Sequence, residues 1–408
     1  MKNLKRSISL LVFLSLFGAA ACTPVVPTLT SEQLLSVEQT LTAIAGEAEA
    51  QKPTATPTKI AEPSATPEKT AEPTNTKSPE KTSIGPTNFP EGINPLTGLK
   101  VEDPELLKRR PVLVKVSNFP VEGRPHAGLS YADIVFEYYI GAGSNRFIGL
   151  YYGQDCGQIG PVRSLRRVDP ELTHMYNGVL AGSGGNPENV LPIVGSILQN
   201  RYVADKYICP GICDDGHGWV TTVFADSAAL TNYFRNRGVD DGPLTLEGML
   251  FDTAVPEGGQ DGSKASVNYT DWTRSDWVYD EKSGKYLRWT EDPNQGYIMI
   301  PLVDRLTNEQ LAFSNVIVLN AGYTEYTTVL HDIYMWKNDD GTKATLFRDG
   351  KAYEIFWNVP DQGQPIRFYD ADGNPFPLKP GYTWMAIIGN TSDVTKENGK
   401  WLFQFRIP

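Results

Sequence analysis

Three arginines lie within five residues of the segment QIGPVRSLRRVDP, residues 158–170. A guanidinium group is planar and can hold a phosphate or a carboxylate through two parallel hydrogen bonds. Arg163, Arg166 and Arg167 are therefore candidate ligands for an anion. Arg146, at the start of the preceding apolar run RFIGLYYG, is a fourth candidate for the same site.

The chain also offers acids that would compete with any external anion for these arginines. Its formal net charge is -11, and Asp169 and Glu171 follow the arginines directly. Glu137, in the apolar run ADIVFEYYI, is expected to pair with one of the arginines. Arg124 and His126, from the segment GRPHAGLSYADIVFE, are candidates for a supporting role at the site. A buried structural histidine is the alternative for His126.

The elements that must position the arginines can be predicted from the local pattern. RFIGLYYG is predicted to be a strand, QDCGQ a turn and IGPVRSL a second strand, while Asp169-Pro170-Glu171 is typical of a helix start. In α/β folds, ligands gather at such connections, and helix N-termini favour anions. In an extended segment Arg163 and Arg167 would share a face and Arg166 would point away, whereas in a helix all three would converge.

The segment CPGICDDGHGW contains two cysteines for which three states are possible. Outside the cytoplasm a disulfide between Cys209 and Cys213 is favoured, ahead of free thiols and of metal binding, because the spacing matches no standard zinc motif. Cys156 is then left over and is expected to be buried. No nucleophile motif accompanies any serine, cysteine or histidine, so we predict no catalytic residue, no metal and no cofactor.

The N-terminus predicts export and a lipid anchor. Residues 1–21 have basic residues, a short apolar run and small residues, which is a signal peptide too short to span a bilayer. The following Cys22 matches the lipobox cysteine of bacterial lipoproteins, which is acylated after cleavage. Removal of the three positive charges in residues 1–21 takes the formal net charge from -11 to -14. This balance argues against nucleic acid as a partner.

Composition divides the rest of the chain into three parts. Residues 22–90 are rich in Thr, Pro, Glu and Lys and are expected to form a disordered stalk. Residues 91–264 mix apolar β-rich runs with helical segments, which predicts an α/β domain. Residues 265–408 show short aromatic and β-branched runs separated by turn pairs such as Ser283-Gly284 and Asp349-Gly350. The fold class is therefore mixed α+β, with a mostly β C-terminal domain.

Several motifs at ordered spacing resemble the YerB-like family of bacterial lipoproteins. They are NPLTGL, RPVLVKVSN, GRPHAGLSYADIVFE, SNRFIGLYY, IGPVRSLRR and SGGNPE in the first half, and DRLTNEQLAFSNVIVL, FRDGKAYEIFWNV and NPFPLKPGYTWMAII in the second. The resemblance covers nearly everything after residue 91. It implies an extracytoplasmic, membrane-anchored protein with two domains, and it implies no activity, because both domains of the family are of unassigned function.

We therefore expect an envelope-anchored lipoprotein whose ectodomain binds an anionic wall or envelope component, such as a cell-wall glycopolymer. One alternative is an enzyme that acts on phosphate-linked glycan carriers, since the order of Arg146, Arg163 and Arg166 is similar to that in LytR-CpsA-Psr phosphotransferases. Phe147 stands where those enzymes carry an aspartate, which disfavours catalysis. A structural or partner-docking lipoprotein is the other alternative.

Overall fold

The computed structural model describes residues 83–216, 221–338 and 341–407. The predicted signal peptide, Cys22 and most of the predicted stalk lie outside these residues. The last part of the predicted stalk is folded, because Ile84 pairs with Phe251 through two backbone hydrogen bonds of 2.8 Å. The folded part therefore begins before residue 91, the start predicted from composition.

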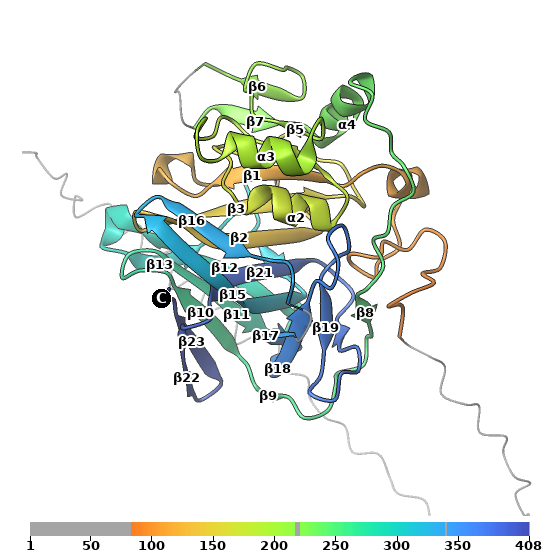
Figure 1. The fold of residues 1–408 in the computed structure, drawn as a ribbon. Helices are drawn as coiled ribbons and strands as arrows, with labels where there is room; N and C mark the ends of the chain where they lie inside the picture. The colour runs from red at the N-terminus through yellow and green to blue at the C-terminus, as the bar shows by residue number, and fades with distance from the viewer. Residues whose placement is uncertain (1–82, 217–220, 339–340, 408) are drawn as a thin grey trace, which may run out of the picture. The chain divides into compact units, whose positions relative to one another are not determined.

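The largest element is a 12-stranded sheet with the order β19-β18-β17-β15-β21-β2-β3-β1-β4-β5, to which β16 and β9 add at β15 and β18 (Figure 1). Its strands are β1 (Val112–Ser117), β2 (Ile134–Gly141), β3 (Ser144–Tyr151), β4 (Val179–Ala181), β5 (Tyr202–Val203), β9 (Gln260–Asp261), β15 (Asn315–Thr327), β16 (Leu330–Tyr334), β17 (Thr342–Arg348), β18 (Lys351–Asn358), β19 (Arg367–Tyr369) and β21 (Thr383–Gly389).

A second sheet has seven strands, with the order β13-β12-β11-β10-β23-β22 and β14 beside β12. Its strands are β10 (Lys264–Asn268), β11 (Arg274–Asp280), β12 (Lys285–Asp292), β13 (Ile298–Pro301), β14 (Ala312–Phe313), β22 (Asp393–Glu397) and β23 (Lys400–Gln404). Two small pairs complete the strands, namely β6 (Ile212–Asp214) with β7 (Val223–Ala225), and β8 (Leu250–Phe251) with β20 (Pro377–Leu378).

The α-helices of the described residues are short and all precede residue 237. They are α2 (Asp169–Met175), α3 (Leu191–Leu198) and α4 (Ser227–Asn236). The described residues also contain four 3-10 helices, namely η1 (Pro104–Lys108), η2 (Val121–Gly123), η3 (Leu129–Tyr131) and η4 (Pro293–Gln295). After α4, every regular element except η4 is a strand. The mixed α+β fold class with a mostly β C-terminal part is thus confirmed.

Strands from the two predicted domains pair in one sheet. β2, from the first, runs parallel to β21, from the second, with Ile134 opposite Thr383 and Tyr138 opposite Ile387. The described residues accordingly belong to a single compact unit. The domain boundary between residues 264 and 265 stays a prediction from the sequence. The large sheet contains strands from both sides of this boundary.

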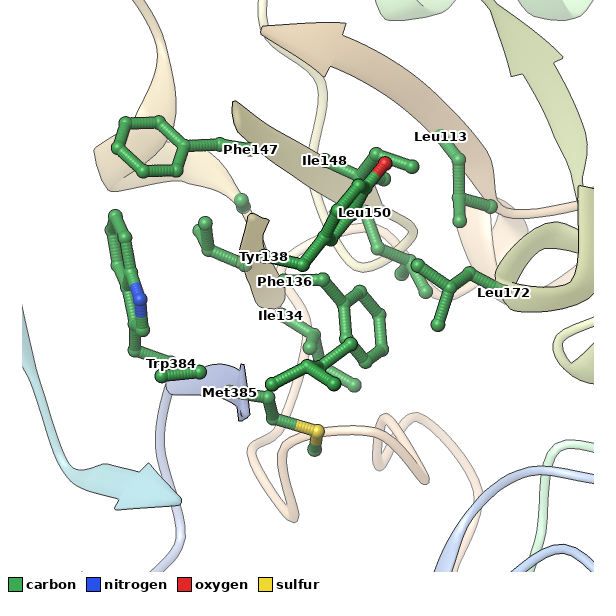
Figure 2. Packing of buried hydrophobic residues seen from close by; sticks show 14 of the residues in the cluster. Leu113, Ile134, Phe136, Tyr138, Phe147, Ile148, Leu150, Leu172, Trp384 and Met385 are labelled. Atoms are coloured by element: carbon green, nitrogen blue, oxygen red, sulfur yellow. The ribbon is translucent and has the colours of Figure 1, made fainter. Parts of the chain in front are cut away.

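The central strands are buried on both faces, so they read as continuous apolar runs rather than as alternating patterns. On one face Leu172 of α2 packs beside Phe136, while Phe147 and Trp384 lie on the other (Figure 2). The second sheet covers that other face, where the rings of Trp384 and Trp277 lie 5.9 Å apart between centroids. The large sheet is therefore the middle layer between short helices and the second sheet.

Candidate anion-binding site

Adjacent strands of the large sheet place three polar side chains on its helix-covered face. Arg146 on β3 lies opposite Tyr138 on β2 and Ser117 on β1, and Lys115 is two residues from Ser117. Side chains two residues apart, and those directly paired across strands, share a face. Lys115, Tyr138 and Arg146 therefore converge within a layer whose other side chains are apolar.

The loop of residues 163–168, here called the arginine loop, lies over this group. Arg163 N donates to Lys115 O at 3.1 Å, and Leu165 N donates to Gly184 O at 2.9 Å. Ser183 N donates in turn to Arg163 O at 3.1 Å. The arginine loop is thus held between the end of β1 and the glycine-rich residues 182–187.

The predicted strand IGPVRSL forms isolated bridges instead of a regular ladder. Val162 pairs with Val116, and Gly160 pairs with Ala127, but the segment contributes no named strand. Pro161 has no N–H to donate, which limits ladder pairing at this point. The arginines consequently follow neither the extended nor the helical arrangement that the sequence suggested.

Asp169 is the carboxylate at the centre of this group and is fully buried. Its Oδ1 lies 3.0 Å from Lys115 Nζ and also accepts a hydrogen bond from the Tyr138 hydroxyl, while its Oδ2 accepts from Arg166 N at 2.6 Å. It was expected to cap α2, but α2 begins at Asp169 with Val168 as its N-cap. Its side chain turns back to the arginine loop instead.

Lys115, Arg146, Arg163 and Arg166, here called the cationic cluster, perturb one another. Burial lowers the pKa of Arg146 to about 9, and the charges of Arg166 and Arg163 add to this effect. Burial also lowers the pKa of Lys115 to about 7, against the opposing charge of Asp169. For Arg163, burial and the charge of Arg166 lower the pKa. The charge of Asp169 opposes the lowering for Lys115, Arg146 and Arg166, so this carboxylate lies close to all three.

Arg146 and Arg166 use part of their hydrogen-bonding capacity on the arginine loop itself. Arg146 Nη1 donates to Ser164 O at 2.8 Å, and Arg166 Nη1 donates to Leu165 O at 3.0 Å. The buried Arg166 Nε has no hydrogen-bond partner within the described residues. Arg163 and Arg166 are half-buried residues, although the Nε atom of each is buried.

Arg167 does not join the other arginines. Its Nε lies 2.6 Å from Asp332 Oδ1, and its guanidinium carbon lies 5.1 Å from the ring centre of Tyr326. Both partners belong to the β15–β16 hairpin. Arg167 therefore ties the arginine loop to this hairpin, and its predicted grouping with Arg163 and Arg166 is wrong in geometry.

Glu137 lies on the opposite face of the large sheet, so it does not pair with the arginine loop. It is fully buried, and its carboxylate lies 3.4 Å from Arg288 Nη2 and accepts from Trp384 Nε1 at 2.8 Å. Asn145 and Ser275 donate to the same carboxylate. Glu137 does pair with an arginine, as expected, but the partner is Arg288 and not an arginine of the arginine loop. The reason is that successive side chains of β2 point to opposite faces, so Glu137 and Tyr138 lie on different sides of the sheet.

Arg124 and His126 lie on the side of Glu137, away from the cationic cluster. Arg124 Nη2 pairs with Glu291 Oε1 at 2.7 Å. His126 Nε2 lies 2.9 Å from Ser117 O, and burial lowers the pKa of His126 to about 3. Both are structural, as the alternative for His126 proposed, and neither supports the arginine loop.

The segment CPGICDDGHGW contains the predicted disulfide bond. Cys209 and Cys213 are joined by a disulfide, and Cys156 is a buried free thiol. His217 from the same segment lies outside the described residues. Within those residues no group of His, Cys, Asp and Glu side chains is arranged to hold a metal ion. Among the described residues, no helix is both long enough and apolar enough to cross a membrane.

Sequence reasoning missed Lys115 and Tyr138 as members of this site, whereas it named Asp169 as an acid that could occupy the arginines. One signal could have found Lys115, because it is the single charge inside the apolar strand of RPVLVKVSN, where a lysine is buried only with a partner. No comparable signal exists for Tyr138, whose role depends on which face of β2 the helices cover.

Comparison with known proteins identifies the sequence relatives of this fold. The family model "Protein of unknown function (DUF3048) N-terminal domain" matches residues 96–207, and the model of its C-terminal domain matches residues 265–385. A curated relative, "Putative lipoprotein YerB" of Bacillus subtilis (strain 168), is 27% identical over 318 residues, which cover 75% of this chain and 89% of the relative.

A solved structure shows the same fold. The crystal structure of YerB protein from Bacillus subtilis matches with a TM-score of 0.56 and 24% sequence identity, over 72% of this chain and 96% of that chain. At this identity the likeness concerns the fold alone. The cationic cluster and its surroundings are therefore interpreted from this chain's own residues.

Proposed function

The chain belongs to the YerB-like family, whose two domains are of unknown function, and we propose that it is an envelope-anchored lipoprotein that binds an anionic envelope component through its cationic cluster. The anion would contact Arg163 and Arg166 directly. Arg146 and Lys115 would lie behind them and add positive charge. A phosphate-bearing wall glycopolymer is the chemical class that this arrangement suits best.

One observation carries the proposal. Lys115, Arg146 and Arg166 share the negative charge of Asp169, and burial together with mutual repulsion lowers the pKa of Arg146. Holding like charges together costs free energy, which a bound anion would return. A guanidinium group can donate two parallel hydrogen bonds to one phosphate group, so we expect phosphate to bind more tightly than a monovalent anion.

The surroundings of the arginine loop support access for a ligand. Gly184 has a left-handed backbone with φ of 76°, and no heavy atom lies within 4 Å of the position that a Cβ would take there. This open position lies beside Leu165, whose N–H bonds to Gly184 O. A ligand could therefore approach the backbone of residues 182–187 and the arginine side chains together.

The enzymatic alternative gains no support from this geometry. LytR-CpsA-Psr phosphotransferases carry an aspartate at the position of Phe147. Here the centre of the Phe147 ring lies 5.1 Å from the centre of the Trp384 ring and 5.2 Å from that of His126. This position faces away from the cationic cluster. We therefore propose binding without assigning a reaction.

The membrane anchor is proposed from the sequence and from the relative described as a lipoprotein. Acylation of Cys22 would place the protein outside the cytoplasmic membrane, with residues 23–82 as the tether. An intact mass of the purified mature chain that lacks acyl groups would contradict this part of the proposal.

Anion binding is tested by calorimetric titration with inorganic pyrophosphate, in the chain that carries Cys22→Ser and is therefore not acylated. Arg163→Ala and Arg166→Ala should each weaken binding about tenfold or more, because a hydrogen bond to a charged group contributes roughly 1.5–3 kcal/mol. The exposed Arg237→Ala is the matched control and should leave affinity unchanged.

Two outcomes would contradict the proposed function. In one, the parent chain binds no pyrophosphate at millimolar concentration. In the other, both arginine variants bind pyrophosphate normally but melt at lower temperature, which would make the arginines structural partners within the fold.

A further inference from the structure

A cavity of about 510 Å³ lies at the end of β2 and β3 that is remote from the cationic cluster. Asp133 directly precedes β2, and Gln154 and Asp155 follow β3, whereas Tyr138 and Arg146 lie toward the other end of these strands. Five strand residues, roughly 17 Å, separate Tyr138 from Asp133. The cavity is therefore distinct from the proposed anion site, and its size suits a small organic ligand.

The wall of the cavity is formed by residues 94–103, which include the family motif NPLTGL. Asn94 anchors this segment, since its Oδ1 accepts from Leu96 N at 2.9 Å and its Nδ2 donates to Asp133 Oδ1 at 2.9 Å. Gly381 N donates to Thr97 O at 2.8 Å and fixes the segment to the start of β21. The motif thus builds a fixed wall, a role that the anion site does not explain.

The polar lining offers both donors and acceptors from separate elements. Asp155, whose side chain is 34% exposed, presents a carboxylate, and Lys100 presents an ammonium group. Asp133 is buried, and its oxygens already accept from Asn94 Nδ2, Tyr152 N and Gly153 N. Gln154 Nε2 donates to Tyr382 Oη at 2.9 Å, which leaves the Tyr382 hydroxyl hydrogen and the Gln154 carbonyl available for a ligand. Hydroxyl groups both donate and accept, so they match such a mixed lining better than a simple ion does.

The apolar part of the lining and the net charge of the cavity further restrict the class of ligand that it can bind. Leu99, which is 36% exposed, contributes an apolar surface to the cavity. The carboxylates of Glu102 and Asp103 add to those of Asp133 and Asp155, and the Arg109 guanidinium offsets one of them, at 2.5 Å from Asp155 Oδ1. An excess of carboxylates repels anions.

We propose that this cavity binds a saccharide that carries no negative charge. Ring hydroxyls would hydrogen-bond to Asp155, Gln154 and Tyr382, and the C–H face of the ring would lie against Leu99. This inference is independent of the anion site, so either can fail alone. Together they would give the ectodomain two sites of opposite charge preference at the two ends of the same strands.

The test uses the full mature chain with Cys22→Ser and ligand-observed NMR titrations. The probes are glucose, galactose, mannose, N-acetylglucosamine and its β-1,4-linked disaccharide, with glucuronate as the anionic match of glucose. At least one neutral sugar should bind with Kd of a few millimolar or lower, and glucuronate should bind at least about tenfold more weakly than glucose.

Variants locate the binding. Tyr382→Phe and Leu99→Ala should each weaken the best neutral sugar about three- to tenfold, as expected for loss of one hydrogen bond or of one apolar contact. Tyr207→Phe, at a tyrosine that is 74% exposed, is the matched control and should have no effect.

Three results would overturn the inference. They are the absence of binding by every neutral sugar up to about ten times the expected Kd, equal binding of glucuronate and glucose, and sugar binding that neither Tyr382→Phe nor Leu99→Ala changes. None of these results would alter pyrophosphate binding, so they remain distinguishable from a failure of the proposed anion site.

Discussion

Glu137 and Asp169 are both fully buried, and each meets positive charge within the fold on its own side of the large sheet. Glu137 is surrounded by donors that satisfy it, and the Arg288 guanidinium carbon lies 4.7 and 5.1 Å from the ring centres of Trp277 and Trp384. Asp169 instead faces several cations at once. Glu137 is therefore part of a buried structural pair, whereas Asp169 lies within the cationic cluster that we propose to bind an anion.

This difference predicts a large stability effect at Glu137. Glu137→Gln leaves the buried Arg288 without its counter-charge, which should lower the free energy of unfolding by about 3–5 kcal/mol. Urea unfolding followed by circular dichroism measures the loss. Glu281→Gln, at an exposed site, is the control and should change stability by less than about 0.5 kcal/mol. A loss below about 1 kcal/mol for Glu137→Gln would contradict a buried pair.

Residue types were more predictable than residue partners. The sequence indicates that an acid in the apolar run ADIVFEYYI needs a cation, and that need is met by Arg288, which is far away in the chain. The alternation of β2 places Glu137 and Tyr138 on opposite faces, but which of these faces carries the arginine loop depends on how the helices pack. The identity of Arg288 depends on how the second sheet packs, which no local pattern encodes.

At the scale of elements, the arginine loop depends on close packing against residues 182–187. A Cβ at Gly182 would clash with the Leu165 side chain and would lie 3.2 Å from Arg163 O. Both contacts belong to the arginine loop. The glycine is thus required by the close approach of the arginine loop to residues 182–187.

Gly182→Ala should therefore displace the arginine loop. We expect it to lower the free energy of unfolding by about 1–3 kcal/mol and to weaken pyrophosphate binding in the same calorimetric titration. Gly195→Ala in α3 is the matched control, because the nearest heavy atom there is Tyr202 Oη at 3.4 Å and alanine favours helix. Equal behaviour of the two variants would show that the packing at Gly182 does not position the arginines.

At the scale of the whole molecule, the two halves share one sheet through β2 and β21. The strand-rich C-terminal part and the hairpins at Ser283-Gly284 and Asp349-Gly350 were predictable, because turn pairs and β-branched runs are local signals. The parallel pairing of β2 with β21 joins residues far apart in the chain. It could not be predicted, because long-range pairing leaves no periodic trace in one sequence.

The central claim is that the cationic cluster binds an external anion. Its most direct test is a crystal structure of the mature, non-acylated chain soaked with sulfate. We expect a sulfate within hydrogen-bond distance of the Arg163 and Arg166 guanidinium groups, beside residues 182–187. A structure in which carboxylates of the chain occupy that space, or in which saturating sulfate leaves it to water, would contradict the claim.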